Sequence, residues 1–165
     1  MSSVSTEIIN SIQQSKIIVV LVIEDDSKAS DLIDCLYDSG IKNYEIALRT
    51  NKSRKSADII LKKGLDINLG LGTVLTIDDV NFAADIGANF ALAPGTNKTV
   101  IDEANRLNLP FFPGVCTPSD IEKANELGCS VLKFFPAEPC GGINYFKSMI
   151  SPYTHLGLRF ISLGG

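Results

Sequence analysis

A single lysine stands at the centre of an apolar stretch that runs from Gly128 to Ala137. Charged side chains are rarely buried without a partner or a task. If the stretch is a strand, its alternation places Lys133 on the same face as Val131 and Phe135. Two interpretations follow from this pattern. Lys133 either protects a strand edge with its ammonium group in water, or is a desolvated amine that attacks a carbonyl group.

A second set of charges lies in residues 44–49, where Glu45, Ala47 and Arg49 share one face of an alternating strand. Opposite charges inside a narrow barrel are unfavourable unless they pair or serve a ligand, so a structural Glu–Arg pair competes with a binding role. Arg49 can hold a carboxylate through two parallel hydrogen bonds, and Glu45 can shuttle protons during imine chemistry. The apolar neighbours of Lys133 favour its neutral amine, whereas Glu45 favours the ammonium.

Two further segments could contribute to a site. Residues 69–73 contain Gly70 and Gly72, which either let the backbone approach a ligand or make room for packing inside a barrel. The hydroxyl group of Thr73 follows directly. Pro94 lies in an Ala-Pro-Gly segment that is first a turn and only secondarily a pocket wall.

Composition narrows the possible functions. The 165 residues are 45% hydrophobic, which favours one compact domain over residues 1–165, and the net charge of −4 offers no basic footprint for nucleic acid. We find no signal peptide and no bilayer-spanning apolar run, and therefore expect a soluble, cytoplasmic protein without a membrane partner. Four cysteines without C-x-x-C spacing and a single histidine, His155, argue against a metal site, and we predict no cofactor. The acidic run at residues 24–26 suits a helix start better than a cation site.

The chain repeats one pattern, a strand-like run followed by a capped amphipathic helix, after a leading helix from about Val4 to Gln14. Alternating units of this kind imply a parallel sheet with right-handed crossovers. An open doubly wound sheet and a (β/α)8 barrel both satisfy the pattern, but no G-x-G-x-x-G follows the first strand. The seven strand-like segments are centred near Val20, Ala47, Leu71, Ala91, Pro113, Leu132 and Ile161.

We therefore predict an α/β fold of the (β/α)8 TIM-barrel class, in which the sequence stops after the seventh strand. Eight units usually need about 200–250 residues, so we expect either that this is an incomplete copy of a longer chain or that the last βα unit is missing from the protein itself. The pattern predicts a helix capped by Asp26 or Ser27 and stopped at Gly40. It also predicts strands over 17–23, 44–49, 68–74, 90–93, 111–115 and 158–163, and helices over 51–62, 76–86, 96–107, 117–128 and 142–150.

Several of these segments together resemble one known family. The residues concerned are Glu45-Ile46-Ala47-Leu48-Arg49-Thr50, Gly70-Leu71-Gly72-Thr73-Val74, Ala93-Pro94-Gly95, Phe112-Pro113-Gly114-Val115 and Leu132-Lys133-Phe134-Phe135-Pro136-Ala137-Glu138, followed by Gly141-Gly142. In this order they resemble the lysine-dependent aldolases that act on 2-keto-3-deoxy-6-phosphogluconate (KDPG) and on 4-hydroxy-2-oxoglutarate (KHG).

The resemblance implies a homotrimeric barrel in which Lys133 forms the Schiff base and Glu45 is the general acid and base. It also implies that Arg49 and Thr73 bind the carboxylate of pyruvate, and that Pro94 and Phe135 line the pocket.

The sequence departs from the family pattern at several positions. Ala47 replaces a threonine, Val19-Val20 replaces a proline-containing pair, and Leu163 replaces a threonine that would offer a hydroxyl group to the substrate. The eighth strand, with its phosphate contacts, is absent. Any phosphate binding would then rely on the backbone of Gly164 and Gly165.

These observations predict a metal-independent class I aldolase that splits a 2-oxo-4-hydroxy acid into pyruvate and an aldehyde through an imine on Lys133. KDPG, which yields glyceraldehyde 3-phosphate in the Entner–Doudoroff route, is the first choice, and KHG, which yields glyoxylate, is the second. A non-catalytic remnant that binds pyruvate or a sugar phosphate is an alternative from another class. A metal-dependent aldolase is disfavoured by the single histidine.

Overall fold

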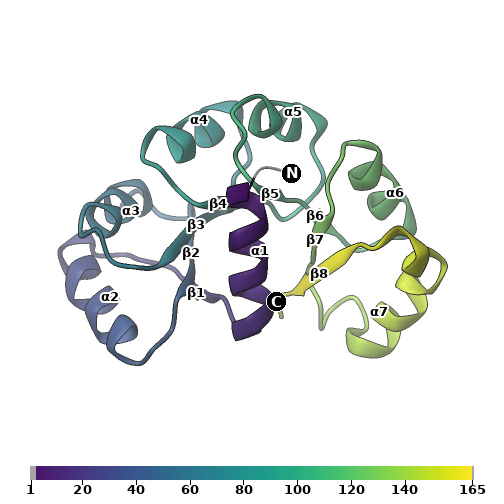
Figure 1. Ribbon diagram of the computed structural model, residues 1–165, viewed down its shortest axis with the longest axis horizontal. Coiled ribbons are helices and arrows are strands. Elements are labelled where there is room, and N and C mark those ends of the chain that lie inside the picture. The colour runs from purple at the N-terminus through teal and green to yellow at the C-terminus, as the bar shows by residue number, and fades with distance from the viewer. Residues whose placement is uncertain (1–2, 165) are drawn as a thin grey trace.

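The computed structural model describes residues 3–164, with side chains from Thr6 onward. The strands form the inner layer of an open arc, helices α2 to α7 cover its outer side, and α1 lies across the inner side (Figure 1). The helices are α1 Ser3–Ser15, α2 Ala29–Asp38, α3 Ser53–Leu61, α4 Ile77–Asp85, α5 Lys98–Arg106, α6 Pro118–Glu126 and α7 Gly142–Ile150. The strands are β1 Val19–Leu21, β2 Asn43–Ala47, β3 Asn68–Gly72, β4 Phe90–Leu92, β5 Phe111–Phe112, β6 Gly114–Val115, β7 Val131–Phe134 and β8 Arg159–Ser162.

Each expected strand and helix is present, but most are shorter than predicted. Short 3-10 helices η1 Asp26–Lys28 and η2 Ser151–Leu156 complete the element order. The predicted cap at Asp26 or Ser27 is wrong, because the Asp25 carboxylate accepts the hydrogen bond from the Ser27 amide. Asp26 is buried instead and forms ion pairs with Lys52 and Lys55 of the next βα unit. No helix among the described residues is both long and apolar enough to cross a membrane.

All strand pairs of the two sheets within residues 3–164 are parallel, and the sheets meet at Pro113. Strand β5 pairs with β4, whereas β6 pairs with β7. The predicted strand over 111–115 is therefore divided where proline cannot donate a backbone hydrogen bond. The Pro113 carbonyl still accepts the Lys133 amide at 2.8 Å, so the inner layer continues across the division. Within the described residues the strand orders are β1-β2-β3-β4-β5 and β6-β7-β8, which leaves β1 and β8 as the outermost strands of the arc.

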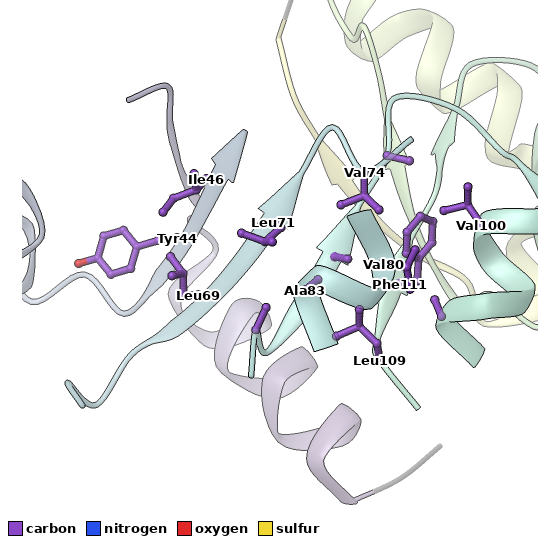
Figure 2. Close-up of a cluster of buried hydrophobic side chains, with 14 of the residues drawn as sticks. Tyr44, Ile46, Leu69, Leu71, Val74, Val80, Ala83, Val100, Leu109 and Phe111 are labelled. Carbon is purple, nitrogen blue, oxygen red and sulfur yellow. The ribbon is translucent and has the colours of Figure 1, made fainter. Parts of the chain in front are cut away.

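The outer faces of the strands carry the main apolar core. Tyr44 and Ile46 of β2 and Leu69 and Leu71 of β3 are fully buried on this side, as the alternation predicts. Figure 2 shows these residues beside one another, with Val80 and Ala83 of α4 in the same cluster. Packing of branched strand residues against helix stripes thus holds the helices onto the outside of the arc.

Helix α1 packs against the inner layer near the starts of the strands. Ile8 and Ile9 belong to a second buried cluster that includes the inner residues Phe90, Phe112 and Val131. Polar side chains fasten the same helix to β2 and β3. The Ser11 hydroxyl group donates to Asn43 at 3.1 Å, and the Asn68 amide group donates to both Ser11 and Asn43. Because Asn43 and Asn68 begin their strands, α1 covers the amino-terminal end of this part of the layer.

Candidate active site

Lys133 and Glu45 form a buried ion pair on the inner side of the arc. The Lys133 Nζ atom lies 3.2 Å from Glu45 Oε1, and each side chain is only 3% exposed. Strand β7, which carries Lys133, is paired on both sides, with β6 and with β8. The interpretation of Lys133 as an edge-protecting residue in water is therefore wrong. The alternative, a lysine removed from water, is the one that the structure supports.

The surroundings of the Lys133 amine are apolar. Val131 lies two residues earlier on the same face and is buried in the inner cluster. The aromatic ring of Phe135, half-buried just beyond β7, has its centroid 5.4 Å from Lys133 Nζ. An ammonium group at that distance is attracted by the ring face, which helps to hold the side chain. The expected apolar walls on both sides of Lys133 are thus present.

Gly70 and Gly72 of β3 make room for neighbouring side chains, which is the second of the two roles considered for them above. A Cβ atom at Gly72 would stand 1.8 Å from Glu45 Oε1, and one at Gly70 would stand 2.1 Å from the Phe90 ring. Gly70 is therefore needed for packing of the inner layer. Gly72 is needed because the Glu45 carboxylate occupies the place of its side chain, a role that the sequence pattern did not reveal.

Arg49 and Thr73 meet beyond the carboxyl ends of β2 and β3. The Arg49 Nε donates a hydrogen bond to Thr73 Oγ1 at 3.3 Å. Strand β2 ends at Ala47, so Arg49 is an exposed loop residue and not part of the inward face. The structural Glu–Arg pair considered above is therefore wrong, because the ion pair of Glu45 is with Lys133. Thr73 has φ 60°, a strained conformation for a β-branched residue and one that tends to occur at functional sites.

The remaining candidates lie at the same ends of the strands. Pro94 is exposed after β4, and its carbonyl contacts Gly114 so closely that a Cβ atom there would lie 2.1 Å from the Pro94 oxygen. The Gly164 carbonyl accepts the Ala137 amide at 3.0 Å, which fastens the segment after β8 to the segment after β7. Gly165 lies outside the described residues.

A cavity of about 640 Å³ adjoins the ion pair. Its lining includes Lys133 and Glu45 together with residues of α1, β1 and β8, such as Ile12, Val20 and Ile161. Arg49, Thr73, Pro94 and Phe135 are not in that lining. The candidate residues thus divide into the buried pair, which reaches the cavity, and the loop residues at the carboxyl ends. Sequence patterns identified Ile12 only as a helix residue, because no chemical group marks it.

The loop after β6 and the first turn of α6 contain two titratable groups with shifted pKa values, Cys116 and Asp120. Burial raises the pKa of the Cys116 thiol, and the neighbouring Cys140 and Asp120 raise it further. Burial also raises the pKa of Asp120, but hydrogen bonds from the Cys116 amide and from Thr117 outweigh it, so the net pKa is lowered. Within residues 3–164 no group of three His, Cys, Asp or Glu side chains is arranged to hold a metal ion.

The geometry suits carbonyl chemistry. A primary amine in apolar surroundings can add to a carbonyl carbon, and a carboxylate at 3.2 Å can accept and return the protons of that reaction. An arginine with a neighbouring hydroxyl group can bind a carboxylate.

Comparisons with known proteins give a consistent result. The model of the family described as KDPG and KHG aldolase matches residues 8–165. The 2-dehydro-3-deoxy-phosphogluconate aldolase of Haemophilus influenzae is 34% identical over 156 residues, which cover 94% of this chain and 74% of that protein. The structure of KDPG aldolase from Legionella pneumophila, with pyruvate captured at low pH as a covalent carbinolamine intermediate, has a TM-score of 0.84 at 30% identity, covering 90% of this chain and 71% of that one.

A second solved structure is similar to the same extent. The 2-keto-3-deoxy-6-phosphogluconate aldolase of Zymomonas mobilis ZM4 with 3-phosphoglycerate has a TM-score of 0.83 at 32% identity, covering 90% of this chain and 69% of that one. The arc of parallel strands is thus the fold of these TIM-barrel aldolases, as the repeated βα pattern predicts.

Proposed function

This chain belongs to the KDPG and KHG aldolase family of class I carbon–carbon lyases, and we propose that it cleaves a 2-oxo-4-hydroxy acid through an imine on Lys133. The observation that carries the proposal is the buried Lys133–Glu45 pair, with 3.2 Å between Nζ and Oε1. A nucleophile and a proton carrier in contact, shielded from water, are what imine catalysis requires.

The first half of the reaction forms the imine. The Lys133 amine adds to the C2 carbonyl of the substrate and gives a carbinolamine. Glu45 accepts a proton from the nitrogen and returns one to the departing hydroxyl group, which leaves as water. The resulting protonated imine draws electrons from the C3–C4 bond. Contact between the two side chains means that no large movement is needed for these proton transfers.

The second half breaks the carbon–carbon bond. Glu45 accepts the proton of the C4 hydroxyl group while the C3–C4 bond opens, which releases an aldehyde and leaves an enamine on Lys133. The same carboxyl group then protonates C3. Water adds to the imine carbon, and pyruvate leaves as the amine is restored. All atoms of substrate and water are accounted for without an oxidant or a reductant.

The residues beyond the carboxyl ends of the strands are proposed to orient the substrate. In this proposal Arg49 and Thr73 bind the carboxylate next to the C2 carbonyl, and their mutual hydrogen bond supports a joint role. Pro94 and Phe135 border the reacting carbons. The backbone of Gly164 and Gly165 would receive a phosphate group, where Leu163 supplies no hydroxyl.

We propose KDPG as the substrate, with pyruvate and glyceraldehyde 3-phosphate as products. Support comes from the Haemophilus influenzae relative, which carries that activity in its name. KHG, which would give pyruvate and glyoxylate, is the second candidate because the matching family includes both activities. Comparing kcat/KM for the two acids, with pyruvate release as the common readout, decides between them.

Borohydride trapping tests the proposed mechanism. The full chain is incubated with pyruvate and sodium borohydride, digested, and mapped by mass spectrometry. We expect a reduced pyruvyl adduct on Lys133, absent from Lys133→Ala and retained in Lys147→Ala, a matched control in which an exposed lysine of α7 is removed. A wild-type chain that binds pyruvate without forming this adduct would contradict the aldolase mechanism and favour a non-catalytic binding protein.

Metal independence is tested separately. We expect turnover to be unchanged after dialysis against a chelator, since the amine and carboxylate supply both the nucleophile and the proton carrier. Loss of turnover that is restored by a divalent cation would favour the metal-dependent alternative.

The homotrimer, the cytoplasmic location and the single domain over residues 1–165 stay predictions. Light scattering of the purified chain checks the homotrimer.

A further inference from the structure

The backbone around Arg49 forms a tight turn beyond the end of β2. Strand β2 ends at Ala47, and the Arg49 amide donates to the Ala47 carbonyl at 2.8 Å, which closes a three-residue turn. The Leu48 amide donates to the Gly72 carbonyl at 2.8 Å, so the turn stays attached to β3. Because Arg49 is exposed, the direction of its side chain depends on how firmly this turn is held.

Ser53, the first residue of α3, bridges the two sides of the turn. Its hydroxyl group donates to the Ala47 carbonyl at 2.8 Å and accepts a hydrogen bond from the Thr50 amide at 3.2 Å. Ala47 precedes Leu48 and Arg49, and Thr50 follows them, so one side chain contacts the backbone before and after the arginine. Ser53 is fully buried, where a hydroxyl group is stable only with its partners in place.

Thr50 fastens the same turn to the preceding βα unit. Its hydroxyl group donates to the Ile23 carbonyl, beyond the end of β1, at 2.6 Å and accepts the Lys52 amide at 3.2 Å. The hydroxyl oxygens of Thr50 and Ser53 lie 3.0 Å apart. The backbone on both sides of Arg49 is therefore held by a connected set of hydrogen bonds from two hydroxyl groups.

This support matters for an arginine that binds a carboxylate. Two parallel hydrogen bonds to a carboxylate require the guanidinium group in one orientation. The Arg49 Nε atom is already directed by its hydrogen bond to Thr73 Oγ1 at 3.3 Å. A long side chain on a loop loses freedom when it binds a ligand, and a fixed backbone reduces the part of that loss that binding must offset.

We propose that Ser53 is a positioning residue for substrate recognition, which fixes the turn so that Arg49 is directed at the carboxylate of a 2-oxo acid bound to Lys133. The inference rests on the proposed function, in which Arg49 binds that carboxylate and Lys133 forms the imine. Ser53 thereby controls the preference of the chain for 2-oxo acids over uncharged ketones, and it does so through Arg49.

Two ketones separate this role from a general loss of structure. Pyruvate carries the carboxylate, and pyruvamide has the same carbonyl group beside a neutral amide. Each is titrated into the full chain and trapped on Lys133 with borohydride, and mass spectrometry gives the concentration at which adduct formation is half-maximal. In Ser53→Ala we expect this concentration to rise at least about tenfold for pyruvate, the effect of losing a hydrogen bond to a charged group, and to change little for pyruvamide.

Ser56→Ala is the matched control. Ser56 lies three residues later in the same helix and is also fully buried, but its hydroxyl group donates to the Lys52 carbonyl at the start of α3. Removing it deletes a buried hydroxyl group of the same type without touching the turn. The preference of Ser56→Ala for pyruvate over pyruvamide should therefore equal that of wild type.

Arg49→Ala tests whether Ser53 acts through the arginine. Adding Ser53→Ala to Arg49→Ala should cause no further loss of pyruvate affinity, because the group that Ser53 positions is gone. Thr50→Val removes the hydroxyl group that contacts Ile23 and Ser53. This variant should weaken the preference for pyruvate in the same direction, and it provides the answer if Ser53→Ala does not fold.

An unchanged preference in both Ser53→Ala and Thr50→Val would overturn the inference. An equal loss for both ketones, or an undiminished loss in the Arg49→Ala background, would also overturn it. Equal trapping of the two ketones by wild type would do the same while leaving Lys133 as the nucleophile. A wild-type chain that forms no adduct with either ketone would contradict the proposed function and the inference together.

Discussion

The two faces of the same strands serve different purposes. On the outer face, Leu132 and Phe134 of β7 are buried in the apolar core against the helices, and Leu71 of β3 is buried in the same way. On the inner face, β7 and β3 present Lys133 and Gly72, beside a charged partner and a cavity. Stability and chemistry are thus separated by the alternation of a strand, so neighbouring residues should respond to mutation in different ways.

The largest effect is expected on the inner face. Lys133→Ala should lower turnover by at least about 10⁴-fold because the nucleophile is lost, and Glu45→Gln by about 10²–10⁴-fold because proton transfer is impaired. Glu45→Gln should still form some trapped imine. Steady-state pyruvate release and borohydride trapping measure the two quantities. Wild-type turnover in both variants would show that the pair is not the catalytic centre.

The residue next to Lys133 should show the opposite pattern. Leu132 is fully buried on the outer face, so Leu132→Ala should lower the free energy of unfolding by about 2–5 kcal/mol through lost burial and a residual cavity. Turnover of the folded fraction should be unchanged. Urea denaturation provides the measurement, with Ile161→Ala as the matched inner-face variant. Because Ile161 is only half-buried beside the cavity, Ile161→Ala should lower the free energy of unfolding by less than Leu132→Ala does.

Two glycines of one strand should separate activity from stability within the inner face. Gly72→Ala places a methyl group where Glu45 Oε1 lies, so the carboxylate must move. We expect kcat/KM to fall by about 10²-fold, the effect of moving a catalytic group by about 1 Å. Gly70→Ala meets the Phe90 ring and should mainly destabilise the fold, by about 1–3 kcal/mol. Equal activity losses in the two variants would argue against a special role for the Glu45 position.

The smallest effect is expected in the helical layer, at the start of α6. Asp120 accepts hydrogen bonds from the Cys116 and Thr117 amides, and its pKa is lowered from the ordinary value of 3.8. A carboxylate with a lowered pKa stabilises the fold above its ordinary pKa, and this contribution is lost as the pH falls through the folded value. Asp120→Asn should therefore destabilise by about 0.5–2 kcal/mol at pH 7.

The difference between Asp120→Asn and wild type should shrink in acid. Urea unfolding at pH 7 and near pH 3 measures it, with Asp31→Asn, an exposed position in the first turn of α2, as the control. A difference that is the same at both pH values would mean that the Asp120 charge does not support the helix start. Turnover at pH 7 should be unaffected, because Asp120 belongs to the helical layer.

Much of this architecture could be predicted from local patterns. Alternation correctly predicted that Glu45 shares a strand face with Ala47 and that Lys133 shares one with Val131. The helices predicted from residues 76 and 117 begin there, since Thr76 and Thr117 each form a capping box with an aspartate three residues later. Both signals involve residues that are close together in the chain, where sequence spacing alone determines which side chains can be in contact.

The errors came from contacts between distant parts of the chain. The length of β2 depends on pairing with β1 and β3, so the sequence could not show that Arg49 lies beyond the strand. The cap at Asp25 was missed because Asp26 instead pairs with Lys52 and Lys55 of another unit. The division of the predicted strand at Pro113 was also missed, because it depends on β5 pairing with β4 and β6 pairing with β7.

The sequence by itself therefore determined most of the elements and the strand faces that carry Glu45 and Lys133, and it indicated imine chemistry as one of the reactions open to these residues. Only the tertiary structure decided that Lys133 and Glu45, 88 residues apart, meet at 3.2 Å. It also decided that Glu45 takes the space above Gly72. The physical reason is that alternation sets the direction of a side chain, whereas the curvature of the paired strands sets what lies opposite it.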